Sequence, residues 1–312
     1  MQKREEQRWI TLTHRLKARH FVLLSSIYRH RTLRKVADEL CLSQPAITKA
    51  LREMEEIVGA VLFDRTSRGL TPTAAADVLA LRSSNFLADL RNLADELIAL
   101  QDGLRGVVRM GLIPFVAHSL LTKTMDMLRQ QGFSYRFVIC DGDTDTLVRM
   151  LRNHELDCVI ARLTHENSGE LEQEILYTQQ PVLLSCRTYA LPKNRKLTIK
   201  DFSNAEWVLP PKGTPTRRAF GEMLVQSKVV IREAHVETSS VSVIKAVLAA
   251  DPTSVTLLPR DLADEIVQEG TWRVLPVDLD FSLPAVSVIT RRDAQGDRTL
   301  DMLKRAIRAS AV

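Results

Sequence analysis

Two short amphipathic segments separated by a three-residue turn constrain the N-terminal part of this sequence more than any other feature. Thr32 can cap a helix over Leu33–Leu40, and Ser43 can cap a second helix that has Pro45 in its first turn. The apolar residues of the second helix recur at helical spacing, at Ile47, Leu51 and Met54. Because only Cys41-Leu42-Ser43 separates the two helices, the segment predicts a helix-turn-helix.

Positive charge and a short hairpin accompany these helices. Residues 1–70 contain 14 Lys and Arg against 8 Asp and Glu, whereas the remaining residues contain 29 against 30. Val61-Leu62-Phe63 and Leu70-Thr71 can pair around Ser67-Arg68-Gly69 as a wing that carries Arg65 and Arg68. A basic module joined to a neutral remainder favours a polyanionic partner for the first, the alternative being an ordinary solvated surface.

A long helix is predicted next. Thr71 as N-cap and Pro72 at the first helical position indicate its start, and the pattern runs to about Gln101. Leucine and phenylalanine recur along it with a period of 3.5 residues, at Leu79, Phe86, Leu90, Leu93, Leu97 and Leu100. Such a period is typical of a coiled-coil seam and predicts a homodimer, the alternative being burial within the same chain.

Strands and helices alternate in the rest of the chain, after a hinge at residues 102–106. Residues 107–161 follow a βαβαβ order, which implies parallel strands with helices on both faces. Further strands are expected at Trp207–Leu209, Val229–Val236, Ser254–Leu258 and Val286–Thr290. The predicted fold class is α/β, with an N-terminal all-α winged helix-turn-helix (1–72), a long linker helix (73–102) and a two-lobe α/β sensor domain like that of periplasmic binding proteins (103–312). Two such lobes bind small ligands in the cleft between them.

Several functional classes are not supported by the sequence. No apolar run approaches the roughly 18–20 residues of a membrane span, and the charged N-terminus predicts no secretory signal, so a cytoplasmic protein with no membrane partner is expected. The four cysteines form no CxxC pair, and no motif for a nucleophile, dinucleotide, nucleotide phosphate or catalytic zinc is present. Asp141, Asp143 and Asp145 lack the glycine and distal glutamate of a calcium loop, so helix capping by Asp143 is expected instead. We therefore expect no enzyme, no catalytic residue, no metal and no cofactor.

The residues from Leu33 to Glu56 closely resemble the DNA-binding signature of LysR-type transcriptional regulators, most specifically at Ser43-Gln44-Pro45-Ala46 with Leu51, Glu53 and Glu55. The resemblance continues through Gly59–Thr66 and Gly69–Thr73, and at the level of strand entries and ends through Glu155–Ala161, Trp207–Pro211 and Val255–Pro259. It implies a ligand-responsive DNA-binding regulator, similar to the branch that controls uptake or breakdown of sugars and aromatic acids. This sequence departs from the family at Ile113–Val116, which is apolar where many members have Ser, Thr or Gly, and at Arg31, where glycine is frequent.

The DNA contacts that follow are expected on the outward face of the second helix, at the start of the first helix and on the wing. These residues are Thr32, Arg34, Ser43, Gln44, Pro45, Ala46, Thr48, Lys49, Arg52, Arg65 and Arg68. Phosphate contacts would give affinity and orientation, and the Gln44–Arg52 face would read the major groove. Capping and solvation remain the alternative for Gln44 and Thr48, and an ion pair with Glu55 or Glu56 remains one for Arg52.

A small organic acid, aromatic or sugar-derived, is the expected effector. Three helix N-termini near the predicted cleft offer free backbone N–H groups to an anion: near Val116–His118, at Thr214–Thr216 and at Thr238–Ser240. Arg162 ends a strand beside the cleft, and apolar residues form one wall. The expected effector-binding residues are Ile113, Pro114, Phe115, His118, Arg162, Thr214, Thr216, Thr238 and Ser239. Helix capping remains the alternative for the hydroxyl residues, and an internal salt bridge for Arg162.

The expected partners are therefore double-stranded promoter DNA, this effector and a second copy of the chain. The resemblance implies that dimers pair into a tetramer, and RNA polymerase is a further candidate. The alternatives are a solute-binding protein, or more generally a non-enzymatic small-molecule-binding protein, and an architectural DNA-binding protein without regulated transcription. A solute-binding protein would not explain the basic N-terminal module, and an architectural DNA-binding protein would not explain the sensor domain.

Overall fold

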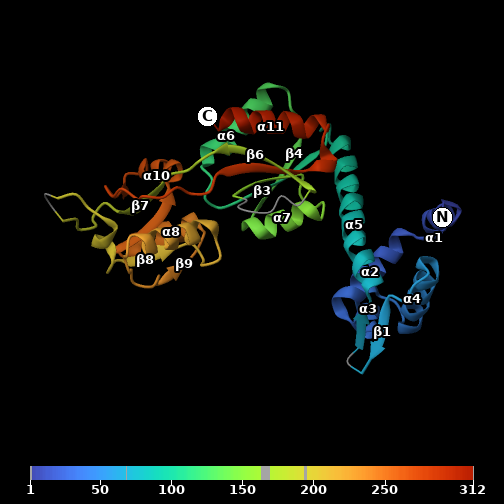
Figure 1. The fold of residues 1–312 in the computed structure, drawn as a ribbon. Helices are drawn as coiled ribbons and strands as arrows, with labels where there is room; N and C mark the ends of the chain where they lie inside the picture. Colours follow the sequence, from blue (N-terminus) through green and yellow to red (C-terminus); the bar gives the residue numbers. More distant parts are fainter. Residues whose placement is uncertain (1, 68, 163–168, 193–194, 312) are drawn as a thin grey trace. The chain divides into compact units, whose positions relative to one another are not determined.

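The computed structural model describes residues 2–67, 69–162, 169–192 and 195–311 (Figure 1), which form two compact units. The N-terminal unit contains residues up to Gly103 together with Arg152–Glu155, and the C-terminal unit contains Leu104–Leu151 and the chain from Leu156 onward. Arg68, one of the expected DNA contacts, lies outside the described residues. No helix in the described part of the chain combines the length and apolar character needed to span a membrane.

The N-terminal unit is a small helical module with a two-stranded hairpin, followed by one long helix. Its elements are α1 (Gln2–Arg15), α2 (Ala18–His30), α3 (Leu33–Leu40), α4 (Gln44–Val58), β1 (Phe63–Thr66), β2 (Gly69–Pro72) and α5 (Ala74–Gln101). The expected inner residues of α4 are buried and share one core with Leu24 and Ile27 of α2 and Val36 of α3. The predicted helix-turn-helix and wing are therefore present, whereas α1 was not predicted.

In this unit the structure confirms one predicted helix cap and corrects another. Ser43 Oγ accepts a hydrogen bond from the Ala46 backbone N–H at 3.3 Å, as expected for the N-cap of α4. The cap of α5 is Thr73, whose Oγ1 accepts from the Ala76 N–H at 3.3 Å, and not Thr71. Thr71 and Pro72 pair with Asp64 and Phe63 in the hairpin, and strand pairing keeps them extended. The helix consequently begins two residues later than predicted.

The C-terminal unit contains two five-stranded sheets, each with its own helices. Lobe one is built on the order β4-β3-β5-β12-β6, and lobe two on β11-β7-β10-β8-β9. The strands of lobe one are β3 (Val107–Leu112), β4 (Arg136–Asp141), β5 (Cys158–Ala161), β6 (Leu171–Tyr177) and β12 (Val286–Arg291). Those of lobe two are β7 (Pro181–Cys186), β8 (Glu206–Leu209), β9 (Val236–Glu237), β10 (Ser254–Pro259) and β11 (Trp272–Val274). The chain crosses between the lobes twice, before β7 and before β12.

Helices cover both sheets. In lobe one, α6 (His118–Gln130) and α11 (Arg298–Ser310) lie on one face of the sheet and α7 (Thr144–Arg152) on the other (Figure 1). Lobe two has α8 (Pro215–Gln226), α9 (Val241–Ala250) and α10 (Arg260–Val267), with a short 3-10 turn at Ile199–Phe202, and a second 3-10 turn at Arg292–Ala294 follows β12 in lobe one. Strand β3 pairs parallel with β4 and β5, as the βαβαβ order predicts, while β12 joins the sheet antiparallel.

One predicted strand is largely absent. The expected strand over Val229–Val236 shrinks to β9, which pairs with β8 at only Val236 and Glu237. The preceding residues lie beyond the edge of the sheet and form separate loop hydrogen bonds, such as Arg232 N–H to the Ser203 carbonyl at 2.8 Å. An apolar β-branched run therefore made this segment resemble a strand, although no neighbouring strand reaches it.

Phe115 links the cores of the two lobes. It follows β3 of lobe one, yet its side chain is buried in the apolar cluster of lobe two, which includes Leu258, Leu262 and Ile266. Large aromatic side chains contribute strongly to such contacts because they bury a large apolar area. Phe115 thus connects lobe one to lobe two at the point where the chain leaves β3.

Candidate functional site

The outward face of α4 brings together five of the residues expected to contact DNA. Gln44, Pro45, Thr48, Lys49 and Arg52 line one surface hollow of about 390 Å³. The hydroxyl of Thr48 donates to the Gln44 carbonyl at 3.0 Å, so it also serves the helix backbone. Lys49 and Arg52 are positioned beside it. This face therefore combines amide, hydroxyl and cationic groups, the chemistry that reads base edges and phosphates.

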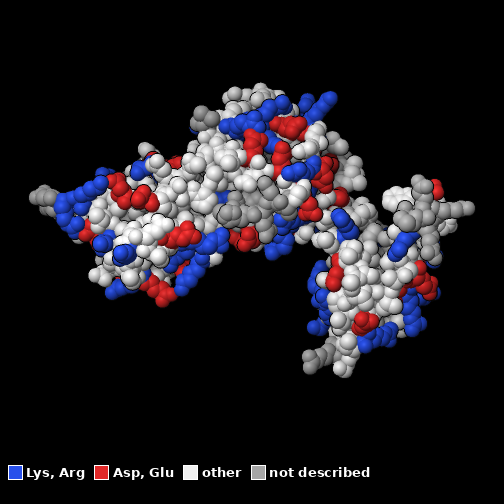
Figure 2. Space-filling model, in the orientation of Figure 1, with Lys and Arg blue, Asp and Glu red and all other residues white. Residues whose placement is uncertain are grey.

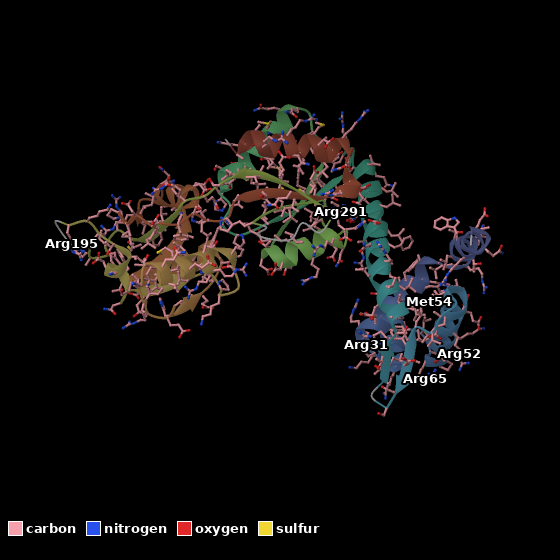
Figure 3. All side chains as sticks on the ribbon, viewed as in Figure 1. Arg31, Arg52, Met54, Arg65, Arg195 and Arg291 are labelled. Atoms are coloured by element: carbon pink, nitrogen blue, oxygen red, sulfur yellow. The ribbon has the colours of Figure 1, made fainter. Side chains whose placement is uncertain are left out.

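Arg52 keeps its charge available to a partner. No ion pair joins it to any described residue, and the alternative partner Glu55 is engaged elsewhere. Glu55 Oε1 accepts from the backbone N–H groups of Leu62 and Phe63, at 2.8 and 3.4 Å, and so fastens the start of the wing to α4. Figure 3 shows Arg52 on α4 and Arg65 on β1, with the buried Met54 in the core of the same module.

The wing is attached closely to the turn after α2. The Leu70 N–H donates to the Arg31 carbonyl at 2.8 Å. Gly69 has φ +120°, and a Cβ at this position would lie 2.6 Å from that same carbonyl oxygen. Arg31 itself has φ +59°, the left-handed conformation for which glycine is frequent. The hairpin carrying the exposed Arg65 is therefore held at a fixed distance from the helices.

The remaining expected DNA contacts lie on or near the starts of α3 and α4. Arg34, Ser43 and Ala46 lie there together with Thr32, which is half-buried and whose hydroxyl makes no cap hydrogen bond. Lys and Arg side chains lie along both edges of the N-terminal module in Figure 2, with Asp and Glu between them. Arg34 on α3 and Arg65 on β1 are both exposed and add positive charge to this module.

Helix α5 exposes a long series of apolar side chains. Phe86 is 39% exposed and Leu93 is 51% exposed, and Leu79 alone among the expected seam residues packs on the N-terminal core. The exposed seam residues are Phe86, Leu90, Leu93, Leu97 and Leu100. The Phe86 ring also contacts Phe21 of α2, with centroids 4.6 Å apart. Contiguous exposed apolar surface of this kind marks an interaction surface.

The C-terminal unit has a cleft of about 1250 Å³ between its lobes. Eight of the nine expected effector residues line it: Ile113, Pro114, Phe115, His118, Arg162, Thr214, Thr216 and Ser239. Thr238 is not among the lining residues, and its hydroxyl accepts the backbone N–H of Ser240, the N-cap of α9, at 3.1 Å. The capping residue is thus two positions later than the predicted contact.

Sequence reasoning missed more than half of the cleft lining. The missed residues are Asp141, Gly142, Asp143, Thr144, Asp145, Pro210, Pro211, Gly213, Pro215, Arg218, Ser240, Val241, Ser242 and Lys245. Asp141 ends β4 and Pro210 follows β8, so the general rule that ligands bind beyond the carboxyl ends of parallel strands could have found these segments. Asp143 also caps α7 as expected, and the hydrogen bond from the Thr146 backbone, 2.8 Å long, lowers its pKa.

Arg162 is the most unusual of the lining residues. Its side chain is only 3% exposed, its Nη2 donates to Gln179 Oε1 and, at 3.5 Å, to the Phe115 carbonyl, and its Nε has no partner. Burial lowers the pKa of Arg162 to about 10, so the guanidinium remains charged at neutral pH. No carboxylate of a described residue forms an ion pair with it. A buried cation without a counter-ion is costly, and an anion in the cleft would relieve that cost.

We expected the N-terminus of α6 to be open to a ligand, but a side chain of the protein itself occupies it. Glu265 of lobe two accepts the backbone N–H groups of His118 and Ser119 there, at 3.0 and 2.9 Å. By contrast, Thr214 and Ser240 cap α8 and α9 with their own hydroxyls and also line the cleft. Among the described residues no group of three or more His, Cys, Asp or Glu side chains could hold a metal ion.

Comparison with known proteins agrees with both units. Residues 18–77 match the family described as bacterial regulatory helix-turn-helix protein, lysR family, and residues 101–311 match the LysR substrate binding domain. The HTH-type transcriptional regulator GalR of Pseudomonas putida is 30% identical over 275 residues, which cover 88% of this chain and 69% of that protein. GbpR of Azospirillum brasilense is 28% identical over 282 residues, covering 89% and 82%.

Solved structures share the fold. CbnR, a LysR family transcriptional regulator, has a TM-score of 0.64 at 16% identity, covering 95% of this chain and 100% of that one. A full-length OxyR variant from Pseudomonas aeruginosa has a TM-score of 0.60 at 16% identity, covering 95% of each chain. The two family matches and the similarity to GalR establish that the chain belongs to the LysR family of transcriptional regulators, which bind DNA and carry an effector-binding domain.

Proposed function

We propose that this regulator binds promoter DNA through α4 and the wing, as a homodimer joined along α5, and that a small organic anion in the cleft modulates this binding. The observation that supports this effector class is Arg162, a buried cation that lines the cleft and forms no ion pair with a carboxylate of any described residue. Its unpartnered Nε supports direct contact with a ligand carboxylate, because guanidinium groups match carboxylates geometrically.

The rest of the lining favours an acid that carries hydroxyl groups over a plain aromatic one. Asp141, Asp143 and Asp145 line the lobe-one wall, where they can accept hydrogen bonds from ligand hydroxyls. Serine and threonine hydroxyls line the lobe-two wall, together with Arg218. Phe115 is the one aromatic residue of the described lining besides the imidazole of His118, and its ring is already buried in the lobe-two core.

The DNA-binding role is divided between two sets of side chains. Gln44, Thr48 and Arg52 on α4 support base readout, since they lie on one surface beside Lys49. Arg34 at the start of α3 and Arg65 on the wing support phosphate contacts, with Arg68 as a further candidate by sequence alone. Phosphate contacts would orient the module, and base contacts would select the site.

The exposed apolar residues of α5 support dimerisation, and the resemblance supports pairing of dimers into a tetramer. A promoter as partner implies action in the cytoplasm, where the chromosome lies, and RNA polymerase is a candidate contact. We propose no catalytic role, in keeping with relatives that are transcriptional regulators.

A gel-shift assay on the DNA upstream of neighbouring genes tests this function. Purified full-length protein should retard that DNA, and hydroxylated carboxylic acids should change the retardation whereas their neutral amides should not. The Arg162→Met variant should still bind DNA but lose the response to the acid. A response to neutral or cationic compounds alone, or an unchanged response in Arg162→Met, would contradict the anionic effector.

A further inference from the structure

The amide of Gln179 lies where the two lobes join and contacts Arg162 directly. Gln179 is in the crossing segment between β6 and β7, and its side chain is only 3% exposed. Its backbone carbonyl accepts the Leu283 N–H at 3.2 Å, and Leu283 belongs to the second crossing segment. Gln179 therefore connects both chain crossings at the base of the cleft.

The side chain of Gln179 separates a buried arginine from a nearby carboxylate. Its Oε1 accepts from Arg162 of lobe one, and its Nε2 donates to both carboxylate oxygens of Asp261 on α10, at 2.8 and 2.7 Å. Nε2 also donates to the Phe115 carbonyl at 3.2 Å. Asp261 thus bonds to a neutral amide rather than to the guanidinium, and Gln179 orients Arg162 without neutralising it.

Tyr177, at the end of β6, does not supply the missing negative charge. Its hydroxyl is buried without a hydrogen-bond partner, and burial, together with Asp261, raises the pKa of Tyr177 above its ordinary value. The phenol therefore stays neutral at physiological pH. Since no described residue forms an ion pair with Arg162, the counter-ion that we infer is a group that enters the cleft.

We propose that Gln179 and Asp261 are positioning residues for the effector. The amide holds the Arg162 guanidinium at the cleft wall, where no carboxylate in the described part of the chain pairs with it, and Asp261 fixes the amide from lobe two. Anion selectivity of the cleft therefore depends on two residues that do not line it. This inference rests on the proposed function, in which Arg162 receives an anionic effector.

Exchanging the amide at position 179 with the carboxylate at position 261 provides a test. The double variant Gln179→Glu/Asp261→Asn keeps the net charge and a hydrogen bond between positions 179 and 261, but places the carboxylate directly against Arg162. The carboxylate introduced at position 179 would then act as an internal counter-ion that competes with any ligand anion. Asp264→Asn is the matched control, because Asp264 is exposed on the same helix.

The first measurement needs no ligand. Arg162→Met is introduced into the wild-type chain and into the double variant, and the thermal midpoints of full-length protein are compared. The inference predicts that the loss of midpoint in the double variant exceeds that in wild type by about 5 °C or more, because only there does the change break a direct buried ion pair. Equal losses in both backgrounds would overturn the inference and make Arg162 a structural clamp.

The second measurement uses calorimetry with sodium benzoate, succinate and gluconate, and with benzamide, succinamide and sorbitol as neutral counterparts. The double variant should bind the best of these acids about 100-fold more weakly than wild type, and Asp264→Asn should match wild type. Equal affinity in the double variant overturns the inference. If wild type binds neutral compounds in preference to every acid, the proposed function fails, and the midpoint comparison still decides the inference about Arg162.

Discussion

Glu265 Oε1 accepts a hydrogen bond from the backbone N–H of Ser119 at 2.9 Å, so a carboxylate of lobe two fills the N-terminus of a lobe-one helix. The other carboxylate oxygen accepts from the His118 N–H and contacts His118 Nδ1 at 3.2 Å. An anion is favoured at such a terminus, and here the protein supplies it from its own chain. In the function that we propose, the anionic group of the effector would therefore pair with Arg162 and not with this terminus.

Replacing Glu265 with Gln should weaken the contact between the lobes. The amide retains one acceptor but loses the charge that strengthens hydrogen bonds from two backbone donors. We expect the free energy of unfolding of the C-terminal unit to fall by about 1–2 kcal/mol, measured by urea denaturation at neutral pH. Asp264→Asn, an exposed change on the same helix, should leave it unchanged.

The difference in stability between wild type and the Glu265→Gln variant should depend on pH, and its direction follows from the pKa of Glu265. Burial raises the pKa of Glu265, but hydrogen bonds from Ser119 and His118 outweigh it and hold the pKa below its ordinary value of 4.5. A carboxyl group with a lowered pKa stabilises the fold above its unfolded pKa, and this contribution is lost as the pH falls through the folded pKa. The free energy of unfolding of wild type should therefore exceed that of Glu265→Gln by the largest amount above pH 4.5, and this difference should shrink below that pH. A constant difference down to low pH would refute this role.

Gly69→Ala should displace the wing. The new Cβ would meet the Arg31 carbonyl oxygen at 2.6 Å, and φ +120° is unfavourable for any residue with a side chain. A strain of about 1–3 kcal/mol is expected, together with a several-fold loss of DNA affinity in a gel-shift titration. Gly221→Ala is the control, since a Cβ there meets no atom within 4 Å. Equal DNA affinity in both variants would mean that the wing does not contact DNA.

Arg65→Gln should weaken binding to specific and unrelated DNA alike. Each phosphate neutralised contributes roughly 0.9 to the slope of log affinity against log salt, so the slope should fall by about that amount. Gln44→Ala should instead reduce discrimination between sites by about 1–3 kcal/mol and leave the slope unchanged. Arg129→Gln, which changes an exposed residue of α6, is the control for charge alone. Identical effects of the Arg65 and Gln44 changes would contradict the division of roles.

The parts of this fold that depend on local chemistry were predictable from the sequence. The cap and first turn of α4 at Ser43, the start of α8 at Thr214 and the inner residues of α4 follow from short-range patterns, and the structure confirms them. The cap at Thr73 was missed because strand pairing with Asp64 and Phe63 overrides a good local start signal at Thr71.

The contacts that define the cleft depend on residues far apart in the sequence. Glu265 lies 147 positions from His118, and Gln179 lies 82 positions from Asp261. No local pattern indicates that either pair will meet. Arg162 was predicted to line the cleft because it ends a strand. Its contact with the amide of Gln179, and the contact of that amide with the Asp261 carboxylate, could be found only in the folded chain.

Leu93→Glu should separate the dimer that we propose. Leu93 lies on the exposed seam of α5, with 51% of its surface accessible in the single chain, and a partner helix would bury it in apolar surroundings. A carboxylate placed there would cost roughly several kcal/mol on association, so sedimentation should show a smaller particle and gel shifts should show weaker DNA binding. Arg91→Glu is the matched control, because Arg91 is exposed on the same helix outside the seam. If Leu93→Glu sediments as wild type does, the apolar series on α5 is not a dimer interface.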